Sequence, residues 1–318
     1  MDNINALILF VSLILLFCIA FSRFLTKAGI PVLVFFIFAG MIMGSDGVGG
    51  IYFDNAVVAS TIGNFAICYI LFAGGMATSW KSAKEVLAPG VLLSTVGVLI
   101  TAVFVAVAAY FLVGLTWLQG LLLGAVVSCT DAASVFSTLR SRRLNLKFGT
   151  ASLLELESGS NDPCAYMLTA VVLSLMEGGT SGGQIVRMIL AQIAYGLLCG
   201  VGIAFAALWM LQRFKFSTDG FDAVFVLAVA VLSYALPSLI GGNGYLSAYL
   251  VGIILGNNPI KNKKSLVSFF DGVTGLMQIV IFFLLGLLSY PSRMHPFLLP
   301  ALAIALFLSF AARPLAVF

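Results

Sequence analysis

Apolar stretches of about 20 residues, the length of a helix that crosses a lipid bilayer, recur along the whole sequence. Of the 318 residues, 61% are apolar and only 9% are charged, whereas roughly a quarter of the residues in a soluble domain are charged. We therefore expect one all-α transmembrane domain over residues 1–318. Its eleven predicted helices occupy residues 4–22, 30–45, 60–78, 89–114, 117–138, 149–176, 185–212, 221–239, 244–257, 266–289 and 297–318.

Several classes of protein are excluded by the remaining composition. The one histidine, His295, lies in a predicted loop, so we expect neither a histidine-based metal site nor a catalytic triad, and no cofactor. The net charge of +4 is spread over short loops, which argues against nucleic acid binding. The first segment follows an acidic start and is predicted to be a retained helix instead of a signal peptide. The cysteines have no metal-ligand spacing and lie in apolar segments: Cys18, Cys68, Cys129, Cys164 and Cys199.

Lys and Arg residues are concentrated in alternate connections between the predicted helices. Only Arg187 and Arg293 lie in or beside the even-numbered connections, and Arg313 lies inside a predicted helix. The positive-inside rule therefore places the odd-numbered connections in the cytoplasm and the N-terminus outside. The basic residues of the odd-numbered connections are Arg23, Lys27, Lys81, Lys84, Arg140, Arg142, Arg143, Lys147, Arg213, Lys215, Lys261, Lys263 and Lys264.

Two short segments in the first part of the chain resemble two segments near its end, which indicates an internal repeat. Residues Ala39–Gly44 match Val251–Gly256 at an offset of 212, and Ile70–Gly75 resemble Phe282–Leu287 at the same offset. The first pair of matching helices runs in opposite directions through the membrane, so we expect an inverted repeat, an arrangement that many secondary transporters use. The repeat partners of helices 5 and 6 would fall after Phe318, so part of the second repeat is expected beyond this sequence.

Five charged side chains within the predicted helices stand out as candidates for function. A charge inside a bilayer is costly unless it is paired or hydrated, so each one is a functional candidate by default. The alternative is that some of them form ion pairs that only hold the bundle together. The five are Asp131, Glu155, Glu157, Asp162 and Arg313.

Small and polar residues fill the middle of the fifth predicted helix, at Val127-Ser-Cys-Thr-Asp-Ala-Ala-Ser134. Serine and threonine can replace missing backbone hydrogen bonds, which allows a broken helix to line a cavity in a membrane. A break near Thr130 and Asp131 would free carbonyl groups to bind a cation. An unbroken helix with close packing of small residues is the alternative.

The sixth predicted helix contains Leu154-Glu-Leu-Glu-Ser-Gly-Ser-Asn-Asp-Pro163. At about 100° per residue, Ser158 and Asp162 share one stripe with Glu155, and Glu157 stacks with Asn161 on another. These hard oxygen ligands suit a small cation. Pro163 lacks an N–H group, which leaves a nearby carbonyl without its helical partner.

Helix depth predicts one ion pair. Glu157 lies about ten residues into its helix from the cytoplasm, and Arg313 lies about 16 residues into a helix that enters from outside, so both fall in the cytoplasmic half. We therefore expect Glu157 and Arg313 to form a structural bridge, which leaves Asp162 free to titrate. Glu155 either lines a cytoplasmic entrance or reaches the lipid headgroups.

The motifs Cys129-Thr-Asp131 and Glu157-Ser-Gly-Ser-Asn-Asp162 resemble the Thr-Asp and Glu-Ser-x-x-Asn-Asp motifs of NhaP-type cation/proton antiporters, relatives of the animal sodium/proton exchangers. Gly244–Asn257 and Ala312-Arg-Pro314 also fit, so the resemblance covers the whole chain. It implies the inverted-repeat antiporter fold, of which eleven of about thirteen helices would be present here, and a homodimer in the bacterial inner membrane. The sequence around Glu157 is most similar to the potassium/proton subgroup.

The resemblance also assigns roles to single residues. Asp162 would bind either K+ or Na+, or a proton, with Asn161 orienting its carboxylate. Thr130, through its backbone carbonyl, would complete the cation site with Asp131 and Ser158. Glu157 and Arg313 match the structural ion pair of the family.

Electroneutral exchange of a monovalent cation for a proton is the function that these roles imply, with no enzymatic activity. The electrogenic relatives carry a second aspartate where this chain has Asn161. A channel or another symporter on a similar inverted-repeat fold is the first alternative. An intramembrane aspartyl protease built on Asp131 and Asp162 is less favoured, because such a protease needs carboxylates close enough to share a proton and the sequence lacks its Gly-x-Gly-Asp motif.

Overall fold

A computed structural model of the chain describes residues 9, 12–21, 32–131, 135, 146–179, 181–214 and 220–318. These residues are almost entirely helical; their only β-type pairing is an isolated bridge between Gly44 and Ile51. The predictions made for Arg23, Lys27, Arg140, Arg142, Arg143, Lys215 and residues 132–134 lie outside this part of the chain.

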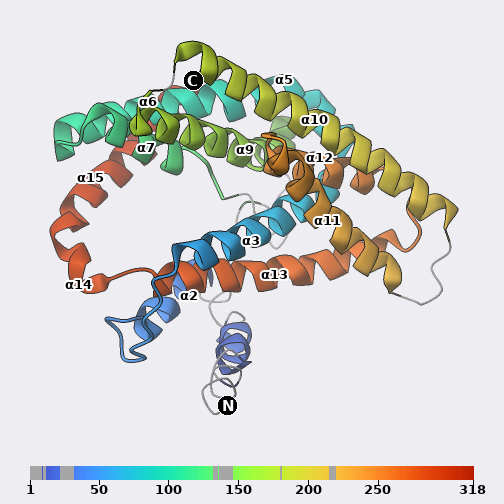
Figure 1. The fold of residues 1–318 in the computed structure, drawn as a ribbon, viewed down its shortest axis with the longest axis horizontal. Coiled ribbons are helices and arrows are strands. Elements are labelled where there is room, and N and C mark those ends of the chain that lie inside the picture. The colour runs from blue at the N-terminus through green and yellow to red at the C-terminus, as the bar shows by residue number, and fades with distance from the viewer. Residues whose placement is uncertain are drawn as a thin grey trace. The chain divides into compact units, whose positions relative to one another are not determined.

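Figure 1 shows the described helices, coloured by their order along the chain. An apolar helix covers Ser12–Phe21. After it come α2 (Val32–Met43), α3 (Ala56–Ala77), α4 (Trp80–Ala83), α5 (Leu87–Leu92), α6 (Val98–Ala108), α7 (Trp117–Val127), α9 (Thr150–Glu177), α10 (Gly182–Arg213), α11 (Phe221–Leu239), α12 (Gly244–Asn257), α13 (Lys263–Leu287), α14 (Pro291–Met294), α15 (Leu298–Phe307) and α16 (Arg313–Val317).

Within the described residues, six helices are long and apolar enough to cross a membrane. Two of them begin at least six residues earlier than the hydrophobic pattern predicts. The predicted segment 89–114 is helical from Trp80, because short 3₁₀ and π turns join α4, α5 and α6 into one continuous path. The predicted segment 297–318 is helical from Pro291 in the same way. Charged residues such as Lys81 and Glu85 cause the first difference, since they lie on the exposed end of a helix and lower its local hydropathy.

The chain divides into two compact units. The first comprises Met1–Ala66 and Gly272–Pro296, and the second comprises Ile67–Asp271 and Phe297–Phe318. In the first unit, a small core of Cys18, Phe36 and Ile279 joins the N-terminal helices to α13.

Close glycine contacts hold the second unit together. Gly124 of α7 lies so near the backbone of α6 that a methyl group at this position would stand 2.2 Å from the Ala102 carbonyl oxygen. Gly200 of α10 packs on Ser247 of α12 in a looser contact of the same kind. Helices α10, α11 and α12 pack side by side (Figure 1). Large apolar side chains, including Leu198 and Phe205 of α10, are exposed, as expected for a surface that faces lipid.

The first of the two repeat matches reappears as an equivalent contact in each unit. In the first unit, a methyl group on Gly40 of α2 would lie 2.1 Å from the Phe283 carbonyl oxygen of α13. In the second unit, a methyl group on Gly252 of α12 would lie 2.2 Å from the Phe72 carbonyl oxygen of α3. Gly40 and Gly252 are the residues that the offset of 212 pairs, so each repeat packs its first helix on the second helix of the other.

The reciprocal contacts correct the register of the second match. A methyl group on Gly286 would lie 2.2 Å from the Ile37 carbonyl oxygen, and one on Gly75 would lie 2.4 Å from the Tyr249 carbonyl oxygen. Gly75 and Gly286 are 211 residues apart, so the sequence alignment at 212, which pairs Gly74 with Gly286, is wrong by one residue. The difference arises because an apolar sequence segment with two adjacent glycines aligns equally well in either register.

Candidate cation site

The broken segment after α7 forms one side of the candidate site. The helix begins with a capping box in which Thr116 and Gln119 exchange hydrogen bonds, and its regular part ends at Val127. Residues 128–131 are not helical, whereas the Val135 amide donates to the Asp131 carbonyl oxygen at 3.1 Å, the spacing of a helical turn. The backbone is thus interrupted at Thr130 and Asp131, and this result excludes the alternative of an unbroken helix.

Helix α9 forms the other side. It runs from Thr150 to Glu177 and continues through Pro163. The proline cannot donate to the Gly159 carbonyl four residues earlier. The side-chain amide of Asn243, the N-cap of α12, donates to the carbonyl oxygen of Pro163 itself at 2.9 Å, which fixes the start of α12 against this part of α9.

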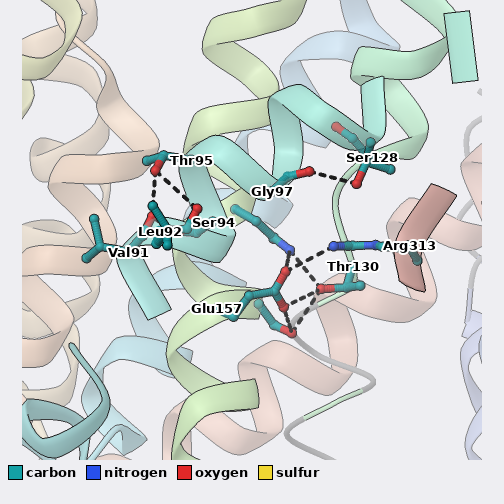
Figure 2. A network of polar contacts seen from close by, with 12 residues as sticks. Val91, Leu92, Ser94, Thr95, Gly97, Ser128, Thr130, Glu157 and Arg313 are labelled. Atoms are coloured by element: carbon teal, nitrogen blue, oxygen red, sulfur yellow. Dashed lines mark hydrogen bonds and ion pairs between the residues drawn. The ribbon is translucent and has the colours of Figure 1, made fainter. Parts of the chain in front are cut away.

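Glu157 is the centre of a dense polar network (Figure 2). Its Oε1 accepts from Arg313 Nη1 at 3.3 Å and from Asn161 Nδ2 at 3.0 Å, and its Oε2 accepts from Thr130 Oγ1 at 3.2 Å and Ser158 Oγ at 3.4 Å. The Glu157 side chain is only 8% exposed and that of Arg313 is 22% exposed. The ion pair is the one that helix depth predicts, and three further donors hydrogen-bond to the Glu157 carboxylate.

A π-helical turn at Leu308–Ala312 directly precedes Arg313. Such a turn inserts one residue into the helix and changes the direction of the side chains that follow it. Hydrophobic periodicity alone does not reveal this turn.

Thr130 connects the broken segment to α9 through its side chain. Its Oγ1 lies 3.0 Å from Ser158 Oγ and accepts from Asn161 Nδ2 at 2.8 Å. Ser158 and Asn161 are both fully buried. The Thr130 hydroxyl is therefore engaged in the Glu157 network.

Asn161 does not have the contacts that the sequence predicts. The resemblance implies that it orients Asp162, whereas its amide nitrogen is bonded to Thr130 and Glu157. Its Oδ1 is buried without a hydrogen-bond partner among the described residues. The spacing of four between Glu157 and Asn161 is the sequence signal for this contact.

Asp162 lies on the other stripe of α9 and faces the broken segment. Its carboxyl group interacts with the Cys129 thiol and lies within electrostatic range of Asp131 and Glu157. Asp162 is partly buried and Asp131 is exposed. Cys129, for which the sequence analysis assigns no role, thus contacts the candidate carboxylate.

Glu155 lies about two helical turns before Asp162 and is partly buried. It falls within electrostatic range of Tyr249 of α12.

A sequence model described as the transmembrane part of sodium/hydrogen exchangers matches residues 12–318. The chain belongs to the sodium/hydrogen exchanger family. As a family member it is a multi-pass membrane protein, and the expected all-α fold is confirmed by its likeness to a solved structure. The sodium proton antiporter MjNhaP1 from Methanocaldococcus jannaschii superposes with a TM-score of 0.84 at 25% identity, over 100% of this chain and 78% of that one.

Two curated relatives are similar in sequence along the whole of this chain. The K(+)/H(+) antiporter NhaP of Alkalimonas amylolytica is 40% identical over 318 residues, which are 100% of this chain and 55% of the relative. The K(+)/H(+) antiporter NhaP2 of Shewanella oneidensis is 40% identical over 319 residues, which cover 99% of this chain and 55% of the relative. The chain therefore spans about half the length of the curated relatives it matches.

Proposed function

We propose that this exchanger moves a monovalent cation, K+ or Na+, in one direction across the membrane and a proton in the other. The two relatives that match over the whole chain are named as K(+)/H(+) antiporters, which favours K+. The Na(+)/H(+) antiporter NhaS2 of Synechocystis is 26% identical over 239 residues. The transport assay described below therefore includes Na+ as well as K+.

The separation of two carboxylates on α9 is the observation that carries this proposal. Glu157 is neutralised by Arg313 and three further donors, whereas Asp162 faces the interrupted backbone at residues 128–131. Asp162 can therefore change its protonation state while the charge next to it stays fixed.

The proposed cation site consists of the Asp162 carboxylate, Asp131, the Thr130 carbonyl oxygen and Ser158. Ser158 retains a lone pair for a cation after its hydrogen bonds to Thr130 and Glu157. Asn161 belongs to the site indirectly, because it holds Thr130 and Glu157 in place instead of binding Asp162.

In this proposal a cation and a proton compete for Asp162, and alternating access converts their competition into exchange. Ionised Asp162 binds the cation, protonated Asp162 releases it, and only the occupied or protonated site crosses between the two sides of the membrane. One carboxylate titrating per cycle gives electroneutral exchange of one cation for one proton. The positive-inside rule places the N-terminus outside, and we propose a homodimer in a bacterial inner membrane.

Replacement of Asp162 tests the proposal. Asp162→Asn is expected to abolish cation-dependent proton movement in proteoliposomes, measured by fluorescence after a pH jump with each alkali cation in turn. The matched control is Asp54→Asn in the exposed connection before α3, which should retain full activity. Exchange that survives in Asp162→Asn would exclude this residue as the shared site.

The same assay separates the alternatives. A channel would conduct the cation without coupled proton movement. An aspartyl protease would need Asp131 and Asp162 to share one proton, whereas here one is exposed and the other is partly buried.

A further inference from the structure

Three tyrosines from three helices of the second unit meet on the C-terminal side of Asp162. Tyr166 of α9 and Tyr245 of α12 are in edge-to-face contact, with ring centroids 4.9 Å apart. Tyr234 of α11 lies against the other side of Tyr245, with centroids 5.0 Å apart, and accepts a hydrogen bond from its hydroxyl group. At these separations the rings are in van der Waals contact and leave no passage for a hydrated ion.

Position on α9 connects this cluster to the proposed site. Tyr166 follows Asp162 by four residues, so it lies on the same stripe of the helix about 6 Å further along the axis. Asn243 binds the intervening Pro163 carbonyl oxygen, and its own Oδ1 caps α12 by accepting from the Leu246 amide at 3.0 Å. The start of α12 is therefore fixed to α9 just beyond Asp162.

Tyr249, four residues after Tyr245, closes the other side of Asp162. Its ring lies on Gly159, where a methyl group would stand 2.5 Å from the ring atoms. Tyr249 is 3% exposed and Tyr245 is 4% exposed. The two tyrosines of α12 thus lie on one stripe of that helix and contact α9 before and after Asp162.

We propose that Tyr166, Tyr234 and Tyr245 form a barrier, here called the tyrosine barrier, that closes the route from Asp162 to the outer surface and must separate for the outward-facing state. Its assignment to the outer side rests on the orientation given under the proposed function. Tyr245 is its central member because it touches both of the other rings, and Tyr166 is the member that moves out of contact when α9 and α12 part.

Cys129 supplies a reporter of access to the site, because its thiol contacts Asp162. Labelling of this thiol is measured without any transport assay. In a variant that keeps Cys129 and replaces the other four cysteines by alanine, a membrane-impermeant cationic methanethiosulfonate is added outside right-side-out vesicles. Tyr166→Ala and Tyr245→Ala are expected to raise the initial labelling rate about tenfold, whereas Tyr245→Phe, which retains the ring, should leave it near the starting value.

Tyr110→Ala is the control, because Tyr110 is an exposed tyrosine that contacts Phe111 and lies apart from the barrier. It should not change the labelling rate. Tyr166 is 46% exposed, so its replacement removes little buried surface, and Tyr166→Leu serves as a second variant for any loss of folded protein. Unchanged labelling in folded Tyr166→Ala, Tyr166→Leu and Tyr245→Ala would overturn the proposal.

Failure of the exchange proposal can be distinguished from failure of the barrier proposal. If Asp162→Asn still exchanged ions while the barrier variants increased outside labelling, the assignment of Asp162 would fail and the barrier would stand. If labelling rose only when the reagent was added to inside-out vesicles, the barrier would face the cytoplasm and the proposed outer location would be wrong.

Discussion

Glu157 and Asp162 show how two carboxylates five residues apart on one helix acquire different chemistry. At about 100° per residue they lie on opposite sides of α9. Glu157 faces Arg313, Thr130 and Asn161, which all donate hydrogen bonds to it. Asp162 faces Cys129 and the broken segment. Under the proposed function, Glu157 carries the fixed charge of the site and Asp162 the exchangeable one.

Loss of one member of the Glu157–Arg313 pair is expected to destabilise the protein. Glu157→Ala leaves the Arg313 guanidinium without its counter-charge in a mostly buried place, and removal of one partner from such a pair costs roughly 3–5 kcal/mol. We expect a marked fall in the yield of monodisperse protein after extraction into detergent. The double variant Glu157→Ala/Arg313→Ala should recover part of that yield, and Glu177→Ala, at the exposed end of α9, should have little effect. A double variant no better than Glu157→Ala would argue against the pair.

At the scale of helices, the glycines that join the repeats decide how closely the backbones approach. Gly252 of α12 touches the backbone of α3 at Phe72, so an added methyl group would clash with that backbone unless one helix moved. Gly202 of α10 has no heavy atom within 4 Å of the position that a methyl group would take. The two glycines thus provide a matched comparison within one unit.

Gly252→Ala is expected to destabilise the second unit by about 1–3 kcal/mol, because an overpacked contact forces backbone shifts. Gly202→Ala should be neutral or stabilise by up to about 1 kcal/mol, because alanine has the higher helix propensity. Thermal unfolding of both variants in detergent measures the difference. Equal unfolding temperatures for the two variants would contradict the packing described here.

A connection outside the membrane gives a prediction about pH. In the first unit Asp46, in the loop after α2, accepts hydrogen bonds from the amide and hydroxyl groups of Ser292 in α14. These hydrogen bonds, with a smaller contribution from Arg293, lower the pKa of Asp46 below its ordinary value. The folded form therefore binds a proton less readily than the unfolded form, and the contact stabilises the loop above the ordinary pKa and is lost as the pH falls through the lowered one.

Hydrogen exchange of residues 44–54 should accordingly be unchanged between pH 5 and 8, after correction for the intrinsic rate, and increase only in stronger acid. Asp46→Ala should show the faster exchange already at neutral pH, because the acceptor is absent. Asp54→Ala, which loses only a contact with the Tyr52 hydroxyl, is the control. Protection in Asp46→Ala equal to that of the unmodified protein would show that Ser292 does not anchor the loop.

Much of the helical order could be predicted because hydropathy and the repeat are local properties of the sequence. The break near Thr130 could be anticipated from small polar residues, and the Glu157–Arg313 contact from depth in the membrane. The partner of Asn161 and the register of Gly75 with Gly286 could not, because they depend on which of two near-equivalent alignments the packing selects. The tyrosine barrier depends on the meeting of three helices distant in sequence, which no spacing along the chain encodes.

At the scale of the molecule, the family and the fold are the setting for the role proposed for Asp162. The chain belongs to the sodium/hydrogen exchangers and shares its fold with MjNhaP1, with a TM-score of 0.84. The central claim is that a cation and a proton compete for Asp162. Competition has a kinetic consequence that neither a channel nor two independent sites would share.

The most direct test is the initial rate of cation-driven proton movement in proteoliposomes, measured against cation concentration over a series of pH values. Competition at one carboxylate predicts that the KM for the cation rises about tenfold for each unit of acidification below the pKa of the site, while the maximal rate stays constant. A KM that is independent of pH, with only the maximal rate changing, would contradict a shared site at Asp162.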